Sequence, residues 1–156
     1  MKLKTLTALT AALVFSQGAQ AGLADATERL LEPEIQGPEA TPAPEGARVY
    51  FISPADGDTV SSPLTVKFGL QGMGVAPAGT QRENTGHHHL LIDDPDVDTS
   101  KPLPSSEQVI HFGGGQTETE IKLDKGEHSL QLLLGDYKHQ PHQPAIRSQK
   151  ITITVE

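Results

Sequence analysis

Cysteine is absent from the 156-residue chain. Without a thiol the protein cannot form a disulfide, and thiolate zinc sites, iron–sulfur clusters, blue-copper centres and a lipidated N-terminal cysteine are excluded as well. With thiolates excluded and only two methionines in the chain, a metal ion is expected to be held by nitrogen or oxygen atoms of His, Asp and Glu.

Aromatic residues and positive charge are also scarce. Aromatic residues make up 4% of the chain and Trp is missing, while 35% of residues are hydrophobic, so the core must be built mainly from Val, Leu and Ile. The 20 acidic and 12 basic side chains give a formal net charge of -8, with no local cluster of Lys and Arg. The chain lacks the attraction to phosphate on which nucleic-acid binding depends, so DNA and RNA are not expected as partners.

Long hydrophobic runs are missing beyond the N-terminus. The first 21 residues are typical of a secretory signal peptide, with Lys2 and Lys4 as the positive region, an apolar stretch over 6–15 and small residues at 19–21. We expect the mature chain to begin near Gly22 and to work in the periplasm, with secretion as the alternative. No later segment reaches the ~20 apolar residues that a membrane helix requires, so no membrane span is expected after signal cleavage.

Residues 22–47 differ in composition from the rest of the chain. Four prolines stand here among acidic and small residues, which predicts a partly extended linker. The folded domain is then expected over 48–156, a length that fits one modest domain.

From residue 48 onward, short segments alternate between apolar and polar residues, as half-buried strands do. The pattern predicts strands over 48–52, 64–70, 87–92, 117–123, 127–135 and 151–155. Gly, Pro and Asp turns separate these segments, and none shows helical periodicity. The sequence therefore predicts an all-β fold, an immunoglobulin-like antiparallel β-sandwich of about seven strands, with a small barrel as the alternative. Leu130, Leu132 and Leu134 share one face and should form a buried stripe.

Histidine is the unusual chemical feature of the chain. It occurs at positions 87, 88, 89, 111, 128, 139 and 142. Because side chains two residues apart leave the same face of a strand, His87 and His89 should project together, while His88 points with Leu90 and Ile92 toward the core. Two imidazoles with this spacing can bind one borderline metal ion such as Zn²⁺ or Cu²⁺.

The other histidines occupy different settings. His139 and His142 lie in a loop whose backbone is restricted by two prolines, so they suit a ligand-holding segment. His111 comes just before three glycines, where the chain can approach another surface closely. His128 shares the face of the leucine stripe and is expected to be a packed, hydrogen-bonded residue.

Several strings of the chain resemble a bacterial family of exported domains, DUF4399. The strings are Val49 to Gly57, Val66 to Met73, Gly86-His-His-His-Leu-Leu-Ile-Asp93, His111-Phe-Gly-Gly-Gly-Gln-Thr117, and Gly126 to Asp136 followed by His139 and His142. The resemblance spans about 49 to 155. It implies a periplasmic or secreted single domain, and the family has no established activity that could be transferred to this chain.

Motifs for other chemistry are weak or missing. The acidic run from Asp93 to Asp98 fails the calcium-loop template, because Thr99 stands where that loop needs Gly and Ser105 where it needs Glu, so a solvated turn is expected. No nucleophile elbow, no His-Glu-x-x-His motif and no catalytic Cys is present, so catalysis stays open but is not favoured.

Three hypotheses follow from these residues. In the first, the protein binds Cu²⁺ or Zn²⁺ for capture or delivery, with ligands drawn from His87, His89, His111, His139 and His142. In the second, it is a non-catalytic periplasmic interaction module whose polar surface binds a protein or a glycan. In the third, the histidines form a buried polar network that only maintains the fold.

Overall fold

A computed structural model describes residues 40–156 of the chain. Within this range the regular structure consists of strands without helices, which confirms the all-β class. The strands are β1 (Arg48–Ser53), β2 (Thr59–Val60), β3 (Leu64–Gln71), β4 (Gly74–Val75), β5 (Thr85–Ile92), β6 (Val109–His111), β7 (Glu118–Ile121), β8 (Gly126–Gly135) and β9 (Ile151–Val155). The six predicted strands are present, and β2, β4 and β6 were missed because two or three residues are too few to show alternation.

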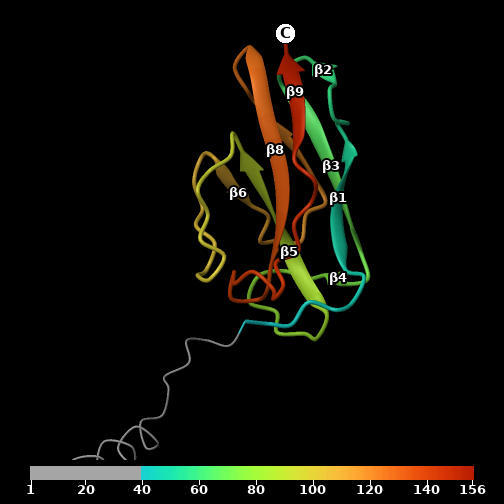
Figure 1. Cartoon of the computed structure of the whole chain (residues 1–156), viewed down its shortest axis with the longest axis vertical. Coiled ribbons are helices and arrows are strands. Elements are labelled where there is room, and N and C mark those ends of the chain that lie inside the picture. The colour runs from blue at the N-terminus through green and yellow to red at the C-terminus, as the bar shows by residue number, and fades with distance from the viewer. Residues whose placement is uncertain (1–39) are drawn as a thin grey trace, which may run out of the picture. The chain divides into compact units, whose positions relative to one another are not determined.

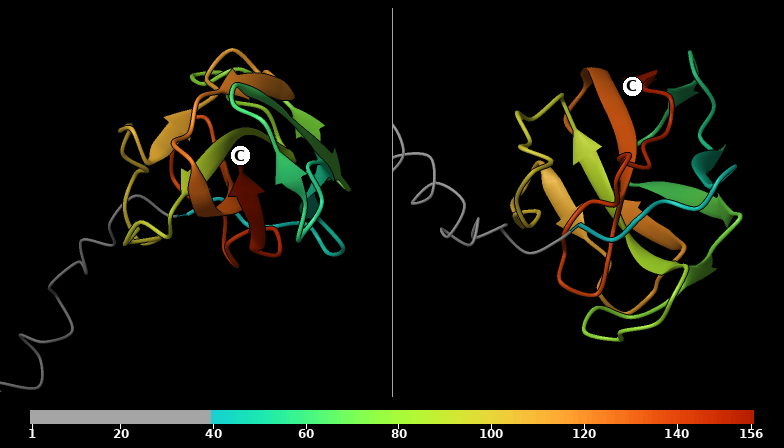
Figure 2. Two further views of the ribbon diagram at one scale, coloured as in Figure 1. Left: turned by 90° about the horizontal axis from the view of Figure 1, so that it is seen from above. Right: turned by 60° about the horizontal axis from the view of Figure 1, so that its bottom comes forward.

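The strands form two sheets. One has the order β1-β3-β7, and the other has the order β2-β9-β8-β5-β4, with β6 also paired to β5. Figures 1 and 2 show β1 and β3 on one side of the domain and β5, β8 and β9 on the other. The longer strands pair antiparallel, as predicted, and the two short strands β2 and β4 add parallel pairs, β2 with β9 and β4 with β5. The immunoglobulin-like sandwich stays a prediction.

A single apolar core lies between the two sheets. β3 contributes Val66 and Phe68, and β8 contributes Leu130, Leu132 and Leu134, which are fully buried. The predicted leucine stripe is therefore confirmed, together with the phase of β8. His88 points into this same interior, where its ring lies 4.7 Å from the ring of Phe68.

The outer face of the larger sheet is covered as well. Leu91 of β5 and Leu133 of β8 pack there against Leu103 and Val109, in a second apolar cluster. His87 and His89 share this face of β5, and all three consecutive histidines are fully buried. His88 points toward the core as expected, but His87 and His89 are buried as well, because β5 lies inside its sheet and loop segments cover its second face.

The described end of the predicted linker is attached to the domain. The amide of Ala43 donates to the carbonyl of Gln143 at 2.8 Å, and the amide of Gln143 donates to the carbonyl of Thr41 at 2.9 Å. We call residues 40–43 the docked strap. The predicted signal peptide and the linker up to residue 39 lie outside the described residues.

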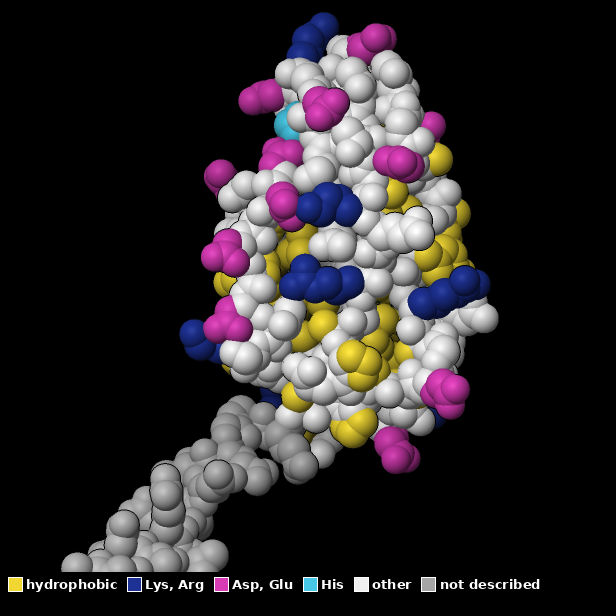
Figure 3. Space-filling model, in the orientation of Figure 1, with side chains coloured by type: hydrophobic (Ala, Val, Ile, Leu, Met, Phe, Trp, Pro, Cys, Tyr) yellow, Lys and Arg dark blue, Asp and Glu magenta, His cyan; other side chains and the backbone are white. Residues whose placement is uncertain are grey.

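The surface shows no concentration of one charge on the face drawn in Figure 3, where Asp and Glu are spread out and histidine is almost hidden. Among residues 40–156, no helix is long and apolar enough to cross a membrane.

Candidate metal centre

Three of the predicted ligands meet on the outer face of the larger sheet. β5 presents His87 and His89 side by side, and β6 places His111 directly opposite His89 in the antiparallel register. Each of the three offers a ring nitrogen, and these nitrogens lie within 4.8 Å of one another. The arrangement follows from strand pairing, because side chains opposite each other in a sheet share a face.

A fourth imidazole comes from the loop that follows β8. The ring centroid of His139 lies 4.7 Å from that of His111, 5.0 Å from that of His87 and 6.3 Å from that of His89. We call His87, His89, His111 and His139 the four-histidine cluster. His139 comes close to the other three because His87 of β5 pairs with Gly135, the last residue of β8, and the loop with His139 begins there.

Two glycines leave room for the rings. A Cβ atom on Gly113 would overlap Cε1 of His111, and a Cβ atom on Gly135 would lie 2.9 Å from Cε1 of His89. Neither position is compatible with the rings as they stand. The two glycines are visible in the sequence, but only the folded structure shows that they make room for imidazole rings.

The ring nitrogens of the cluster are short of partners. Both nitrogens of His87, both nitrogens of His89 and Nε2 of His111 are buried and make no hydrogen bond within the described part of the chain. Buried polar atoms without partners are costly and uncommon in native proteins. A shared metal ion would give each ring one strong partner, and the donor set of neutral imidazoles suits Zn²⁺ or Cu²⁺.

Burial keeps three imidazoles of the cluster neutral, those of His87, His89 and His111. The pKa of His87 is lowered to about 4, and burial is the largest cause. The neighbouring imidazoles of His111 and His139 lower this pKa further, whereas the Asp136 carboxylate raises it. Burial and the three neighbouring imidazoles of the cluster lower the pKa of His89 to about 3. Burial, followed by the proximity of His139, also lowers the pKa of His111. Neutral imidazole is the form that coordinates a metal, so these three are ready to bind at neutral pH.

The remaining histidines do not join the cluster. His142 is fully buried, but its ring makes none of the ring contacts that connect the four. Its pKa is lowered by burial, which outweighs the raising effects of Asp136 and of backbone groups of Leu134 and Thr85. The sequence placed His142 among the candidate ligands because it shares a loop with His139, yet the structure does not bring it to the other four.

His88 and His128 also lie elsewhere. Burial lowers the pKa of His88 to about 4, although backbone groups of Gln116 and Gly69 favour its protonated form. Neither ring nitrogen of His88 makes a hydrogen bond of good geometry to the described residues. His128 contacts Asp93 at 2.9 Å and the carbonyl of Asp124 at 3.0 Å, so it is the hydrogen-bonded residue that was predicted.

The acidic run forms a bend at Asp93 and an irregular segment over 94–98, with all four carboxylate residues exposed to solvent. Asp93 has a φ of 57° and Asp94 a φ of 54°, and their carboxylates pair with His128 and Lys150. Asp98 accepts hydrogen bonds from the amide and hydroxyl of Ser100. These carboxylates are engaged locally and do not form a cation site with one another.

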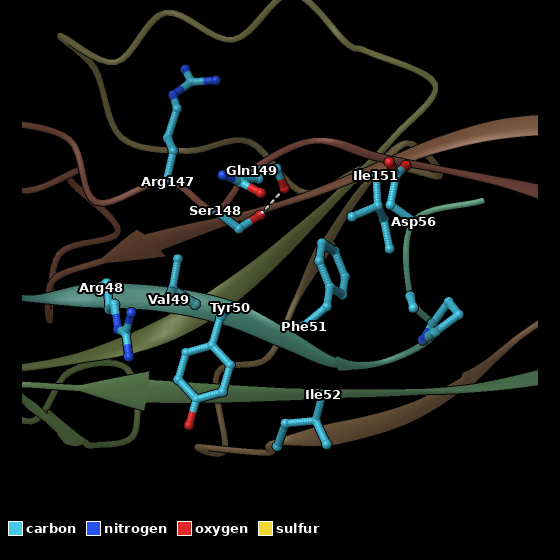
Figure 4. A pocket seen from close by; sticks show the side chains of 12 residues that line it. Arg48, Val49, Tyr50, Phe51, Ile52, Asp56, Arg147, Ser148, Gln149 and Ile151 are labelled. Carbon is cyan, nitrogen blue, oxygen red and sulfur yellow. Dashed lines mark hydrogen bonds between the residues drawn. The ribbon is translucent and has the colours of Figure 1, made fainter. Parts of the chain in front are cut away.

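A separate cleft of about 520 Å³ lies beside β1, with residues 147–151 along its other side. Figure 4 shows Tyr50 and Ile52 on the strand and Arg147 across the opening. The Asp56 carboxylate accepts a hydrogen bond from the amide of Thr152. No histidine lines this cleft, so it is distinct from the four-histidine cluster.

Asp136 is the residue near the cluster that the sequence did not single out. It follows Gly135 at the end of β8, is only 3% exposed, and organises the loop that holds His139. The sequence feature that could have pointed to Asp136 is an acidic residue directly after an apolar strand. That feature is also common in ordinary turns.

The fold and the cluster together define an all-β domain with histidines gathered on a covered sheet face. The family model described as "Domain of unknown function (DUF4399)" matches residues 66–156. The chain therefore belongs to the DUF4399 family, as its histidine strings suggested. The matched range contains all four members of the cluster and begins after β1. No curated protein and no solved structure shows significant similarity to the chain.

Proposed function

We propose that this chain is an exported protein that binds one Zn²⁺ or Cu²⁺ ion through His87, His89 and His111, with His139 as the fourth ligand. The observation that carries the proposal is the convergence of buried ring nitrogens that make no hydrogen bonds among the described residues. An ion at this point would relieve the cost of burying them.

The exposure of the ligands suits capture or delivery of the ion. His87 and His89 are fully buried, whereas His111 and His139 are half-buried. The inner pair would anchor the ion, and the outer pair would be the first to bind and the last to release it. The signal-like N-terminus supports action outside the cytoplasm, in the periplasm.

The interaction-module hypothesis draws less support. A surface that recognises a protein or glycan needs accessible polar groups, and two of the four clustered histidines have no exposed surface. We therefore place metal binding first.

Calorimetry with Zn²⁺ and Cu²⁺ on the untagged chain at pH 7.5 tests the proposal. We expect saturable binding tighter than about 10 μM, which corresponds to about 7 kcal/mol. The His87→Ala/His89→Ala variant should lose this binding. The matched control is His128→Ala, which also removes an imidazole from the larger sheet but leaves the cluster intact. Absence of such binding, or equal binding by the His87→Ala/His89→Ala variant, contradicts the proposal.

A further inference from the structure

The carboxylate of Asp136 is the centre of the loop that holds His139. Its Oδ1 accepts hydrogen bonds from the amide of Lys138 at 2.8 Å and the amide of Gln140 at 2.9 Å. Its Oδ2 accepts from the hydroxyl of Thr41 at 2.7 Å. A carboxylate with three donors in a buried position fixes the groups around it, because charge-assisted hydrogen bonds are the strong ones.

The backbone of Asp136 closes the same loop. Its amide donates to the carbonyl of Gln140 at 2.8 Å, and its carbonyl accepts from the amide of His139 at 2.9 Å. His139 itself has a φ of 67°, a left-handed conformation that few residues other than glycine adopt. Such a conformation persists only where the surroundings impose it, and here the surroundings are the hydrogen bonds to Asp136.

A second anchor holds the far side of His139. The carbonyl of His139 accepts from the amide of Leu103 at 2.8 Å. With its amide held by Asp136 and its carbonyl held by Leu103, the residue has little freedom, and its ring is directed to the rings of His87 and His111. Neither Asp136 nor His139 belongs to the group of three residues whose ligand atoms lie within 4.8 Å of one another. The ring of His139 lies beside that group, whereas Asp136 bonds to the loop of His139, so its influence on the ion would run through His139 or through charge.

We infer that Asp136 is a positioning residue that presents His139 as the fourth ligand of the metal centre and links this ligand to the docked strap through Thr41. The inference rests on the proposed function. Groups that orient metal ligands without touching the ion typically change affinity by about 10- to 100-fold when they are removed. The docked strap thereby contributes, through Thr41 and Asp136, to the affinity of the site for the ion.

A double-mutant cycle tests the inference, since residues that act through each other are not additive. Zn²⁺ affinity is measured by calorimetry for the full untagged chain and for the variants Asp136→Ala, His139→Ala and the combination of both. We expect Asp136→Ala to weaken binding about 10- to 100-fold. In the His139→Ala background the same change should weaken it by no more than about 2-fold, because the ligand that Asp136 positions is already gone.

Cu²⁺ electron paramagnetic resonance gives a second readout that a general loss of stability would not move. The nitrogen hyperfine pattern should report four imidazoles in the wild type and three in both Asp136→Ala and His139→Ala. Asp136→Asn is the matched control, because its amide oxygen can still accept from Lys138 and Gln140 and its amide nitrogen can donate to Thr41. It should keep the four-imidazole spectrum, and its loss of affinity measures the contribution of charge alone.

If Asp136→Ala does not fold, Thr41→Val replaces it in the cycle. This change removes one of the three donors to the carboxylate and should weaken Zn²⁺ binding only when His139 is present. Equal weakening in both backgrounds, or an unchanged four-imidazole spectrum in Asp136→Ala, overturns the inference while metal binding itself stands. A wild-type chain that binds neither Zn²⁺ nor Cu²⁺ overturns the proposed function and the inference together.

Discussion

The buried histidines should make the metal-free protein sensitive to mild acid. His88 is the best residue for this test, because it lies on the core face of β5 and is not part of the four-histidine cluster. Its pKa is lowered from 6.5 to about 4, chiefly by burial. In the unfolded chain the imidazole takes up a proton below about pH 6.5, whereas in the folded chain it stays neutral until about pH 4.

The sign and the size follow from that difference. Between these two pH values the unfolded state binds more protons, so the free energy of unfolding falls as the pH falls and is fully retained only above about pH 6.5. One pKa unit corresponds to 1.36 kcal/mol, so His88 alone should remove about 2.5 kcal/mol between pH 7.5 and 4.5. His87 and His89 act in the same direction, since their pKa values are lowered to about 4 and about 3.

Urea unfolding followed by circular dichroism measures the effect, with a chelator present to exclude metal ions. The free energy of unfolding is determined at pH 7.5 and pH 4.5 for the wild type and for His88→Leu. Carboxylates titrate in both proteins, so the difference between the two pH-dependent losses isolates His88. The wild type should lose about 2.5 kcal/mol more than the variant. Equal losses would refute the reasoning, because His88 would then titrate normally in the folded state.

Three further predictions concern the core, the cluster and processing. Leu132→Ala should lower the free energy of unfolding by ~2–5 kcal/mol, since Leu132 is fully buried between the sheets, and a loss below about 0.5 kcal/mol would contradict that placement. Gly113→Ala should weaken Zn²⁺ binding in calorimetry, because the added methyl group would overlap the His111 ring; unchanged affinity would show that the ring can move without cost. Protein recovered from the exported fraction should begin at or near Gly22, and an intact mass that includes residues 1–21 would contradict the signal peptide.

Much of the fold was readable in the sequence because alternation is a local signal. Strands β3, β5, β8 and β9 were placed within two residues of their ends, and the burial of Leu130, Leu132 and Leu134 followed from their spacing. The opposite facing of His88 and His89 followed from the same period. Short pairings such as β4 with β5 were not readable, because two residues have no pattern and their geometry depends on a partner distant in sequence.

The sequence by itself determined which chemistry was available to this protein. Without cysteine no thiolate ligand was available, and the histidines supplied a set of nitrogen ligands suited to Zn²⁺ or Cu²⁺. Only the tertiary structure decided which histidines meet. Strand pairing places His111 opposite His89. Hydrogen bonds to Asp136 hold the loop that carries His139 close to them, whereas His142 of the same loop lies apart. Those choices depend on contacts between residues far apart in the chain, and spacing along the sequence carries no information about them.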